Sequence, residues 1–325
     1  EIQLFAYSNN VNEDRFTKLI KQYFDNWELV FHKTDKDLIN LIRKDNLDIL
    51  FDLSGHTANN RLAVFKNRCA PVQATWCGWL ASTGVKEIDY IIGDKYATPL
   101  SDQNKFTEKI YQLKRIWECL SISDLDFKDL VIKKNNEKYV IFGSLVNPAK
   151  INETVINVWS KILNQTDNSK LFLKDGFFDI PEVRKKFIKK FEDNKVNKNK
   201  LIIEGKSSRA KYMDCYNKID IVLDTFPASG GTTSFEASYM GVPILTKINE
   251  NSFWFRTGES INQNLNMSDW IAKDENDYVQ KAVKFSENKN HLNNLKTELR
   301  NSALKSSLYD SKNYCNDFYE MLLNI

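Results

Sequence analysis

The second half of the chain alternates short apolar runs with amphipathic stretches, and this alternation restricts the fold more than any other feature. Helical spacing of apolar residues is clearest after Asn152, a favourable helix cap, and from Pro181, a favourable first helical residue. Further helices are expected at residues 211–219 and 232–239. Apolar runs typical of buried strands lie between the helical stretches, at residues 139–143, 170–173, 201–203, 220–224 and 243–246. This alternation predicts an α/β fold with a parallel sheet and helices on both of its faces.

The first half repeats the pattern less regularly, with strands expected at residues 2–6, 29–31, 48–51, 72–76 and 89–92. A chain of 325 residues is long enough for two domains, and the polar stretch 124–138 marks their boundary. We therefore predict an N-terminal domain over residues 1–134 and a C-terminal domain, ending in a helix, over residues 135–325. Because the chain begins inside a strand, upstream sequence of the first domain is expected to be missing. Two doubly wound domains place their ligand in a cleft at the carboxyl ends of their strands.

Composition excludes several classes of protein. Hydrophobic residues make up 42% and charged residues 27%, which is typical of soluble globular proteins. No apolar run approaches the length of a membrane span, and the N-terminus lacks the pattern of a signal peptide. A net charge of +3 is too small to indicate a nucleic-acid partner. The five cysteines have no metal-binding spacing, so a cytoplasmic protein with reduced thiols and no metal site is expected. Asp124-Leu125-Asp126, an acidic pattern that can hold a divalent cation, occurs often by chance and lies in the expected linker.

The most informative segment runs from Asp224 to Thr233, between a buried strand and a helix. It contains Ser229, Gly230, Gly231, Thr232 and Thr233. Adjacent glycines allow a ligand to approach the backbone closely, and the first N–H groups of a helix favour an anion. The threonine hydroxyls can add hydrogen bonds to a phosphate, and Glu236, one turn later, can accept hydrogen bonds from ribose. A glycine turn with a threonine cap explains the same residues equally well, and the pattern is not a P-loop.

Two other expected strand ends carry polar residues. Lys150, in the turn 147–150, is either a surface lysine or a cation that neutralises a departing diphosphate. His56, in the segment 52–57, is a general base, a substrate contact or a hydrogen-bonded turn residue. The loop 76–84 contains glycine and tryptophan, and it either lines an acceptor groove or is packed against its neighbours.

In this order, these segments resemble the catalytic region of the protein O-GlcNAc transferase and SPINDLY family, glycosyltransferase family 41. The resemblance spans nearly the whole chain, and its most specific motifs are residues 48–57, 70–73, 223–227, 230–233 and 241–243. It implies a GT-B architecture of two Rossmann-like domains, with a nucleotide sugar bound between them and no required metal. It also implies upstream elements, a strand with a histidine-bearing loop and tetratricopeptide repeats, that this sequence does not contain.

The resemblance assigns individual roles. Lys150 matches a lysine that contacts the diphosphate, residues 230–233 match the pyrophosphate loop, and Glu236 matches the acidic ribose ligand. Further nucleotide contacts are implied for Asn147, Ser207, Arg209, Tyr212 and Ser229. Asn147, Arg209 and Tyr212 replace the family's glutamine, lysine and histidine, and the family's Gly-Tyr-Pro-Gly-Thr loop is altered at residues 78–84. These departures bear on nucleotide identity and on acceptor recognition.

The expected activity is therefore an inverting glycosyl transfer. The most specific form is transfer of GlcNAc from UDP-GlcNAc to serine or threonine hydroxyls of a protein, without a metal, with Lys150 and His56 as the catalytic candidates. A nucleotide-sugar donor and a protein or peptide acceptor are the expected partners. The sequence leaves open an O-fucosyltransferase that uses GDP-fucose and a non-catalytic nucleotide-sugar-binding protein.

Overall fold

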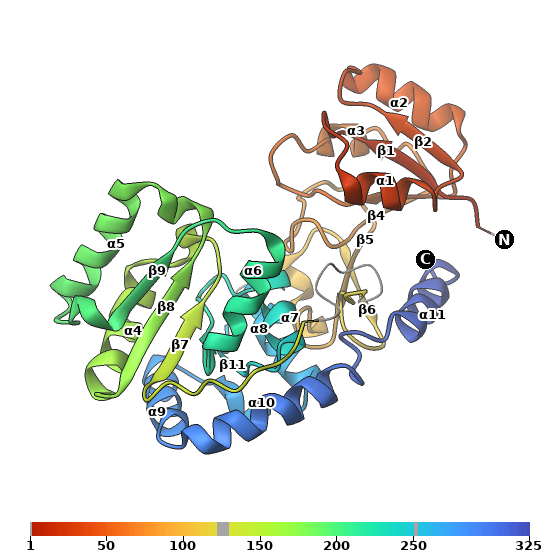
Figure 1. Ribbon diagram of the computed structural model, residues 1–325. Helices are drawn as coiled ribbons and strands as arrows, with labels where there is room; N and C mark the ends of the chain where they lie inside the picture. Colours follow the sequence, from red (N-terminus) through yellow and green to blue (C-terminus); the bar gives the residue numbers. More distant parts are fainter. Residues whose placement is uncertain (1, 122–129, 250–252) are drawn as a thin grey trace. The chain divides into compact units, whose positions relative to one another are not determined.

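The structure is a computed structural model that describes residues 2–121, 130–249 and 253–325. The chain divides into two compact units, which we describe separately (Figure 1). The N-terminal unit comprises Glu1–Ile92 and Asp102–Tyr111, and the C-terminal unit comprises Gly93–Ser101 and Gln112–Ile325. The acidic pattern at residues 124–126 lies outside the described residues.

The N-terminal unit contains a two-stranded sheet and most of a four-stranded sheet. Strands β1 (Phe5–Ser8) and β2 (Asn26–Leu29) form a parallel pair, with α1 (Arg15–Lys21) between them in sequence. The second sheet has the order β3-β4-β5-β6, formed by Ile49–Asp52, Val72–Thr75, Tyr90–Asp94 and Lys109–Leu113. The last two residues of β5 and of β6 belong to the C-terminal unit. Helices α2 (Asp35–Lys44) and α3 (Leu62–Phe65) and the 3-10 helix η1 (Leu100–Lys105) complete the series. The core is aliphatic, with Val30, Leu38, Ile42, Leu50 and Ile88 all buried.

The C-terminal unit is built on a six-stranded sheet with the order β12-β11-β10-β7-β8-β9 and parallel neighbours throughout. Numbered along the chain, this is the order 3-2-1-4-5-6 of doubly wound folds. The strands are β7 (Val140–Ser144), β8 (Ser169–Lys174), β9 (Leu201–Glu204), β10 (Ile221–Leu223), β11 (Ile244–Lys247) and β12 (Ile271–Ala272).

Helices cover both faces of this sheet, as the sequence predicts. Helices α4, α5 and α9 pack together on one face, and α7 and α8 pack together on the other (Figure 1). The Asn152 side chain accepts a hydrogen bond from the N–H of Val155 at 3.0 Å and so caps α4, while Pro181 is the first residue of α5. The bounds are Glu153–Gln165 for α4, Pro181–Asp193 for α5, Arg209–Asp214 for α6, Thr232–Tyr239 for α7, Phe253–Asn264 for α8 and Glu275–Ser286 for α9.

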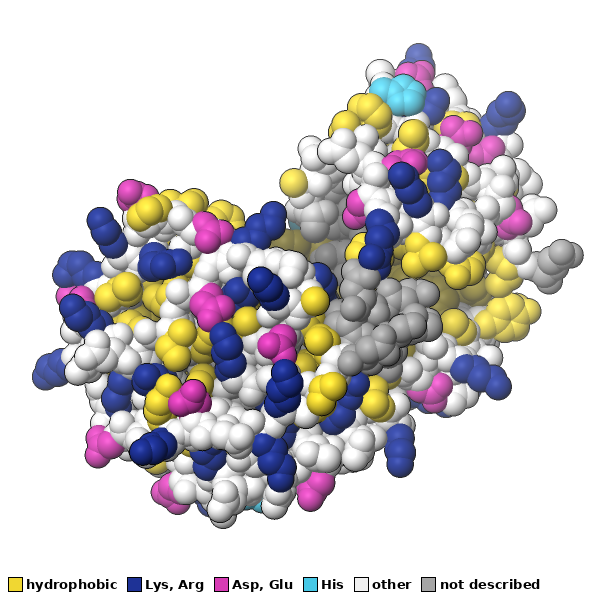
Figure 2. All heavy atoms as spheres, viewed as in Figure 1, with side chains coloured by type: hydrophobic (Ala, Val, Ile, Leu, Met, Phe, Trp, Pro, Cys, Tyr) yellow, Lys and Arg dark blue, Asp and Glu magenta, His cyan; other side chains and the backbone are white. Residues whose placement is uncertain are grey.

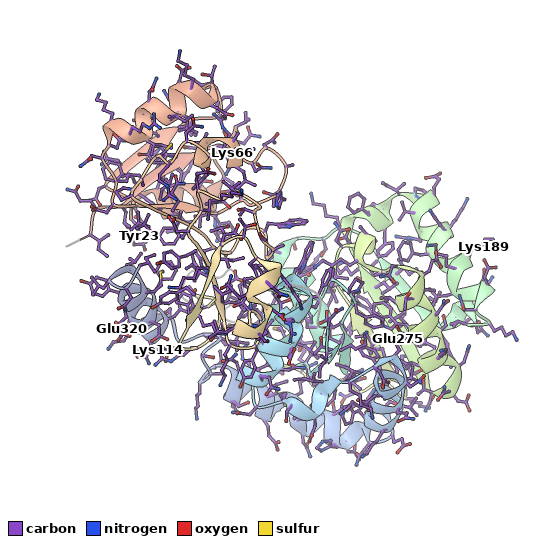
Figure 3. The ribbon with its side chains drawn as sticks, turned by 180° about the vertical axis from the view of Figure 1, so that it is seen from behind. Tyr23, Lys66, Lys114, Lys189, Glu275 and Glu320 are labelled. Carbon is purple, nitrogen blue, oxygen red and sulfur yellow. The ribbon has the colours of Figure 1, made fainter. Side chains whose placement is uncertain are left out.

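The chain ends in two helices, α10 (Lys289–Ala303) and α11 (Ser311–Leu322), in agreement with the expected C-terminal helix. Helix α11 is tied to the segment that follows β6. Asp317 accepts a hydrogen bond from Arg115 at 2.6 Å, and Glu320 forms an ion pair with Lys114 (Figure 3). None of the described helices is both long enough and apolar enough to span a bilayer.

Two strands were not predicted, and several boundaries differ from the sequence expectation: β1 spans Phe5–Ser8 rather than 2–6, and β2 spans Asn26–Leu29 rather than 29–31. Strand β6 was not predicted because its apolar residues are interrupted by polar ones, and β12 was not predicted because it has only two residues. The helix expected over 211–219 begins at Arg209 and continues after Asp214 as the 3-10 turn Cys215–Lys218. The domain boundary predicted at residues 134 and 135 falls between β6 and β7.

Candidate functional site

The strand order identifies one position on the sheet of the C-terminal unit. Strands β7 and β10 are neighbours, but the chain leaves β7 towards β8 on one side and leaves β10 towards β11 on the other. Ligands of doubly wound sheets bind outside the carboxyl ends of the strands at such a reversal. The two segments that follow β7 and β10 are those that contain Lys150 and Ser229, so the fold brings two predicted site segments together.

Lys150 is in direct contact with the segment 224–233, which we call the glycine loop. The Lys150 Nζ donates a hydrogen bond of 2.8 Å to the backbone carbonyl of Ser229 and lies 5.0 Å from the centre of the Trp254 ring. Burial lowers the pKa of Lys150, and the negative charge of Asp224 opposes that shift. An ammonium group has three donors, so the one that holds Ser229 leaves capacity for phosphate oxygens.

Asp224, the first residue after β10, holds the backbone of the glycine loop through hydrogen bonds. Its carboxylate accepts hydrogen bonds from the N–H groups of Gly230 at 2.7 Å and Thr225 at 2.9 Å, and from the Thr246 hydroxyl at 2.8 Å. The residue is only 2% exposed, and this burial raises its pKa to about 6, against the lowering effect of these hydrogen bonds and of Lys150. The carboxylate therefore fixes the backbone of the loop and places a negative charge near the Lys150 ammonium.

Helix α8 holds the other side of the loop. The Ser229 hydroxyl donates to the Trp254 carbonyl at 2.9 Å and lies 2.6 Å from the Thr257 hydroxyl. A Cβ atom on Gly258 would come within 2.5 Å of an oxygen of the Asp224 carboxylate, so only glycine allows α8 to approach this closely. The loop is thus held by residues that lie more than twenty positions further along the chain.

The amino terminus of α7 faces outward from this loop. Gly231 is its N-cap, and no side chain caps the helix. Within the described part of the chain, the N–H groups of Gly231, Thr232 and Thr233 meet no hydrogen-bond acceptor. Thr232 is exposed, and a Cβ on Gly231 would meet no atom within 4 Å. These N–H groups, together with the helix dipole, are arranged to bind an anion.

Glu236 lies one turn into α7 and is paired. Its side chain is 3% exposed and forms an ion pair with Arg209 of α6, whose side chain is 43% exposed. The Tyr216 hydroxyl lies 3.4 Å from the second carboxylate oxygen of Glu236 and 3.0 Å from the Thr233 carbonyl. Burial raises the pKa of Glu236, and the Arg209 charge opposes this shift.

Three predicted nucleotide contacts line one hollow of about 250 Å³, which we call the α6 hollow. The predicted contacts in its wall are Ser207, Arg209 and Tyr212. The other lining residues are Lys174, Asp175, Gly176, Gly205 and Lys206. The Arg209 guanidinium lies 5.2 Å from the centre of the Tyr212 ring, and the Tyr212 hydroxyl donates to the Leu145 carbonyl at 3.3 Å. Asn147 does not line this hollow. It is exposed, and its side chain accepts a hydrogen bond from the N–H of Ala149 in its own turn.

His56 belongs to the N-terminal unit, where it follows β3. Its Nε2 lies 3.1 Å from the Ser82 carbonyl, in the loop that follows β4, and its ring contacts Trp79 edge to face at 6.5 Å. A Cβ on Gly78 would come within 2.1 Å of the Leu53 carbonyl oxygen, so the loops after β3 and β4 are packed backbone to backbone. The exposed imidazole therefore lies on two loops that are packed tightly against each other.

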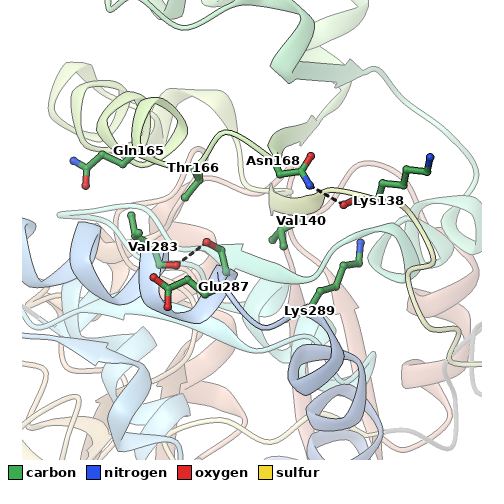
Figure 4. Close-up of a pocket in the computed structure, with 9 residues that line it drawn as sticks. Lys138, Val140, Gln165, Thr166, Asn168, Val283, Glu287 and Lys289 are labelled. Atoms are coloured by element: carbon green, nitrogen blue, oxygen red, sulfur yellow. Dashed lines mark hydrogen bonds between the residues drawn. The ribbon is translucent and has the colours of Figure 1, made fainter.

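A second hollow of about 330 Å³ lies at the opposite edge of the same sheet, where β7 and β8 begin (Figure 4). It contains none of the predicted site residues. Its lining residues are Lys138, Val140, Gln165, Thr166, Asn168, Val283, Ser286, Glu287 and Lys289.

Basic and acidic side chains are interspersed over the face of the C-terminal unit seen in Figure 2. Among the residues that the structure describes, no group of three or more His, Cys, Asp or Glu side chains is arranged to hold a metal ion.

Several residues that shape the site were not predicted from the sequence. Asp224 was recognised only as part of a motif, and Trp254, Thr257 and Thr246 carried no local signal. Tyr216 was expected only as part of a helix. These residues act through contacts between elements, which a pattern within one element does not reveal.

Comparison with known proteins gives one consistent result. The family model described as Glycosyl transferase family 41 matches residues 1–124 and 131–318. A protein of Eustoma exaltatum subsp. russellianum, named "Probable UDP-N-acetylglucosamine--peptide N-acetylglucosaminyltransferase SPINDLY", is 33% identical over 97% of this chain and 35% of its own length. A protein of the same name from Arabidopsis thaliana is 32% identical over 92% of this chain and 33% of its own length. The chain spans about a third of the length of these relatives.

Solved structures that are similar to this chain include glycosyltransferases. A mutant of the Thermobaculum terrenum O-GlcNAc transferase is 28% identical, with a TM-score of 0.92 over 98% of this chain and 61% of that chain. The Anabaena protein HepE, in complex with UDP and glucose, has a TM-score of 0.63 over 99% of both chains. At 10% identity, this second likeness shows the fold alone.

Proposed function

The chain belongs to glycosyltransferase family 41 and has the predicted GT-B fold, and from this premise we propose that it is the catalytic region of a protein O-GlcNAc transferase. It transfers N-acetylglucosamine from UDP-GlcNAc to serine or threonine hydroxyls of a protein acceptor, with inversion at the anomeric carbon. One observation carries the proposal. A partly buried lysine and the uncapped amino terminus of α7 converge on the carboxyl ends of β7 and β10.

This arrangement suits the departure of a nucleoside diphosphate. The acceptor oxygen bonds to the anomeric carbon as the bond to the diphosphate oxygen breaks, so negative charge grows on the leaving UDP. The Lys150 ammonium and the N–H groups of residues 231–233 stabilise that charge, and Asp224 holds the loop in place beforehand. The hydroxyl proton passes to a phosphate oxygen of UDP or to water. Groups fixed in advance need no rearrangement as charge develops.

The choice of sugar and acceptor rests on the relatives, whose printed names specify UDP-N-acetylglucosamine as donor and a peptide as acceptor. We propose the same substrates here, with no metal requirement and a cytoplasmic location. Ser207, Arg209 and Tyr212, which line the α6 hollow, are the proposed contacts to the nucleotide. His56 is a proposed catalytic residue.

The decisive experiment compares wild type with Lys150→Ala, using mass spectrometry of acceptor proteins incubated with UDP-GlcNAc or GDP-fucose. Loss of one charge-stabilising donor costs about 3–4 kcal/mol in the barrier, so we expect kcat to fall by roughly two to three orders of magnitude. The matched control is Lys189→Ala, an exposed lysine of α5, which should leave transfer unchanged. Near-normal transfer by Lys150→Ala would refute the assignment, and transfer of fucose instead of GlcNAc would reassign the donor.

A further inference from the structure

Trp254, in the first turn of α8, lies against the lysine of the candidate site. The Lys150 Nζ lies over the indole ring, 5.0 Å from its centre, and also donates to the Ser229 carbonyl at 2.8 Å. An ammonium group within about 6 Å of an aromatic ring is attracted by the negative charge density of the ring face, and tryptophan gives the strongest attraction of this kind. Two separate groups therefore hold the ammonium.

The backbone that carries this indole is anchored to the glycine loop and to the core. The Trp254 carbonyl accepts hydrogen bonds from the Ser229 hydroxyl at 2.9 Å and from the Thr257 hydroxyl at 3.0 Å. The preceding residue, Phe253, is buried and contacts Trp117 edge to face, with ring centres 5.6 Å apart. The start of α8 cannot shift without breaking these contacts, so the indole has a defined place beside the ammonium.

Lys150 gains from this contact because burial removes water from its charge. Burial lowers the pKa of the lysine, and the negative charge of Asp224 opposes that shift. The Ser229 carbonyl is a neutral acceptor for one of the three N–H donors of the ammonium. An aromatic face attracts a cation without neutralising it, so the positive charge of the lysine remains for a departing diphosphate.

We propose that Trp254 is a positioning residue for the transfer reaction, whose ring face holds the Lys150 ammonium in the orientation that meets the leaving diphosphate. This inference rests on the proposed function, because it concerns the same lysine and the same leaving group. Trp254 acts through Lys150, and the property that matters is the negative charge density of the indole face rather than the bulk of the side chain.

Fluorination of the indole tests the proposal, because each fluorine withdraws charge density from the ring face and changes its shape very little. Tryptophan and its mono-, di- and trifluoro derivatives are incorporated at position 254 alone. Release of UDP from UDP-GlcNAc is then measured with an acceptor protein found by the mass spectrometry described above. We expect kcat to fall with each fluorine, by about tenfold over the series, or about 1.4 kcal/mol. The KM for UDP-GlcNAc should change much less, because charge on the leaving group grows in the transition state.

A second series connects the effect to Lys150. In the Lys150→Ala background the same derivatives at position 254 should leave the residual rate unchanged, because the cation is gone. Ordinary variants should follow the same order, since Trp254→Phe keeps an aromatic face and Trp254→Leu keeps only an apolar side chain. The matched control is fluorination of Trp270, whose ring stacks on Phe285 with centres 4.1 Å apart and whose modification should leave kcat unchanged.

Two results would overturn the inference. One is a constant kcat across the fluorinated series in the folded protein. The other is an equal fall with fluorination in the Lys150→Ala background, which would show that Trp254 acts by a contact of its own. A wild-type chain that releases neither UDP from UDP-GlcNAc nor GDP from GDP-fucose would instead remove the proposed function, and this outcome is distinct because it appears before any substitution is made.

Discussion

Asp224 lies at the centre of the candidate site, and Asp224→Asn isolates its charge. The amide oxygen of asparagine can still accept from the N–H groups of Gly230 and Thr225, and its NH2 group can donate to the Thr246 hydroxyl. The substitution therefore keeps the hydrogen-bond pattern of the loop while removing a carboxylate that is 2% exposed.

The expected effect on stability follows from the pKa. Burial raises the pKa of Asp224 from 3.8 to about 6, so the folded state binds this proton more tightly than the unfolded state does. The contribution of this bound proton to the free energy of unfolding is fully present below pH 3.8 and is lost as the pH rises through 6. At 1.36 kcal/mol per pH unit, the full effect is about 3 kcal/mol, of which roughly 1.4 kcal/mol is lost between pH 5 and pH 7.5. Asp224→Asn lacks this dependence.

Thermal unfolding of wild type and Asp224→Asn between pH 5 and pH 7.5 measures the difference. For a unit of this size, 1.4 kcal/mol corresponds to roughly 3–5 °C, so the melting temperature of wild type should fall relative to the variant by that amount as the pH rises. Asp310→Asn is the control, because the pKa of this exposed cap of α11 is lowered by its hydrogen bonds to Asn313. Both states of Asp310 are ionised above pH 5, so that variant should run parallel to wild type. If Asp224→Asn also runs parallel to wild type, the electrostatic reasoning is wrong.

Three further predictions concern single side chains. Gly230→Ala places a Cβ atom within 2.5 Å of a hydroxyl in the first turn of α7, so it should weaken UDP binding as measured by calorimetry. In Gly231→Ala the added Cβ atom meets no atom within 4 Å, so this variant should fold with unchanged stability. His56→Ala should reduce the rate of transfer but alter the free energy of unfolding by less than about 1 kcal/mol, because the imidazole is exposed, and His291→Ala, also exposed, should alter neither. Thr246→Val removes a donor from the buried carboxylate and should cost about 1–3 kcal/mol in urea unfolding at pH 7.5; an unchanged midpoint would contradict that contact.

Much of the fold could be predicted from the sequence because its signals are local. The apolar runs of β7, β8, β9, β10 and β11, the cap at Asn152 and the helix start at Pro181 depend on neighbouring residues, and the structure confirms them. The helix expected over residues 232–239 has these bounds in the structure. Strand β12 was missed because two residues cannot show a period.

The candidate site was predictable only in part. The glycine loop and Lys150 carry recognisable motifs, and the sheet order brings them together across 79 residues of sequence. The predicted ribose role of Glu236 remains a prediction, but its partner Arg209 and its burial appear only in the structure. No pattern within α7 indicates that a side chain from α6 will cover this carboxylate.

By itself, the sequence determined most of the order of strands and helices, the family and the segments in which chemistry is expected, because periodicity and motifs are properties of neighbouring residues. Tertiary structure alone decided which groups meet and how charged they are. The pKa of Asp224 rises because residues distant in sequence exclude water from it, and Lys150 meets Ser229 because β7 and β10 are adjacent. Desolvation and pairing depend on packing between elements, and packing is fixed only when the whole unit has folded.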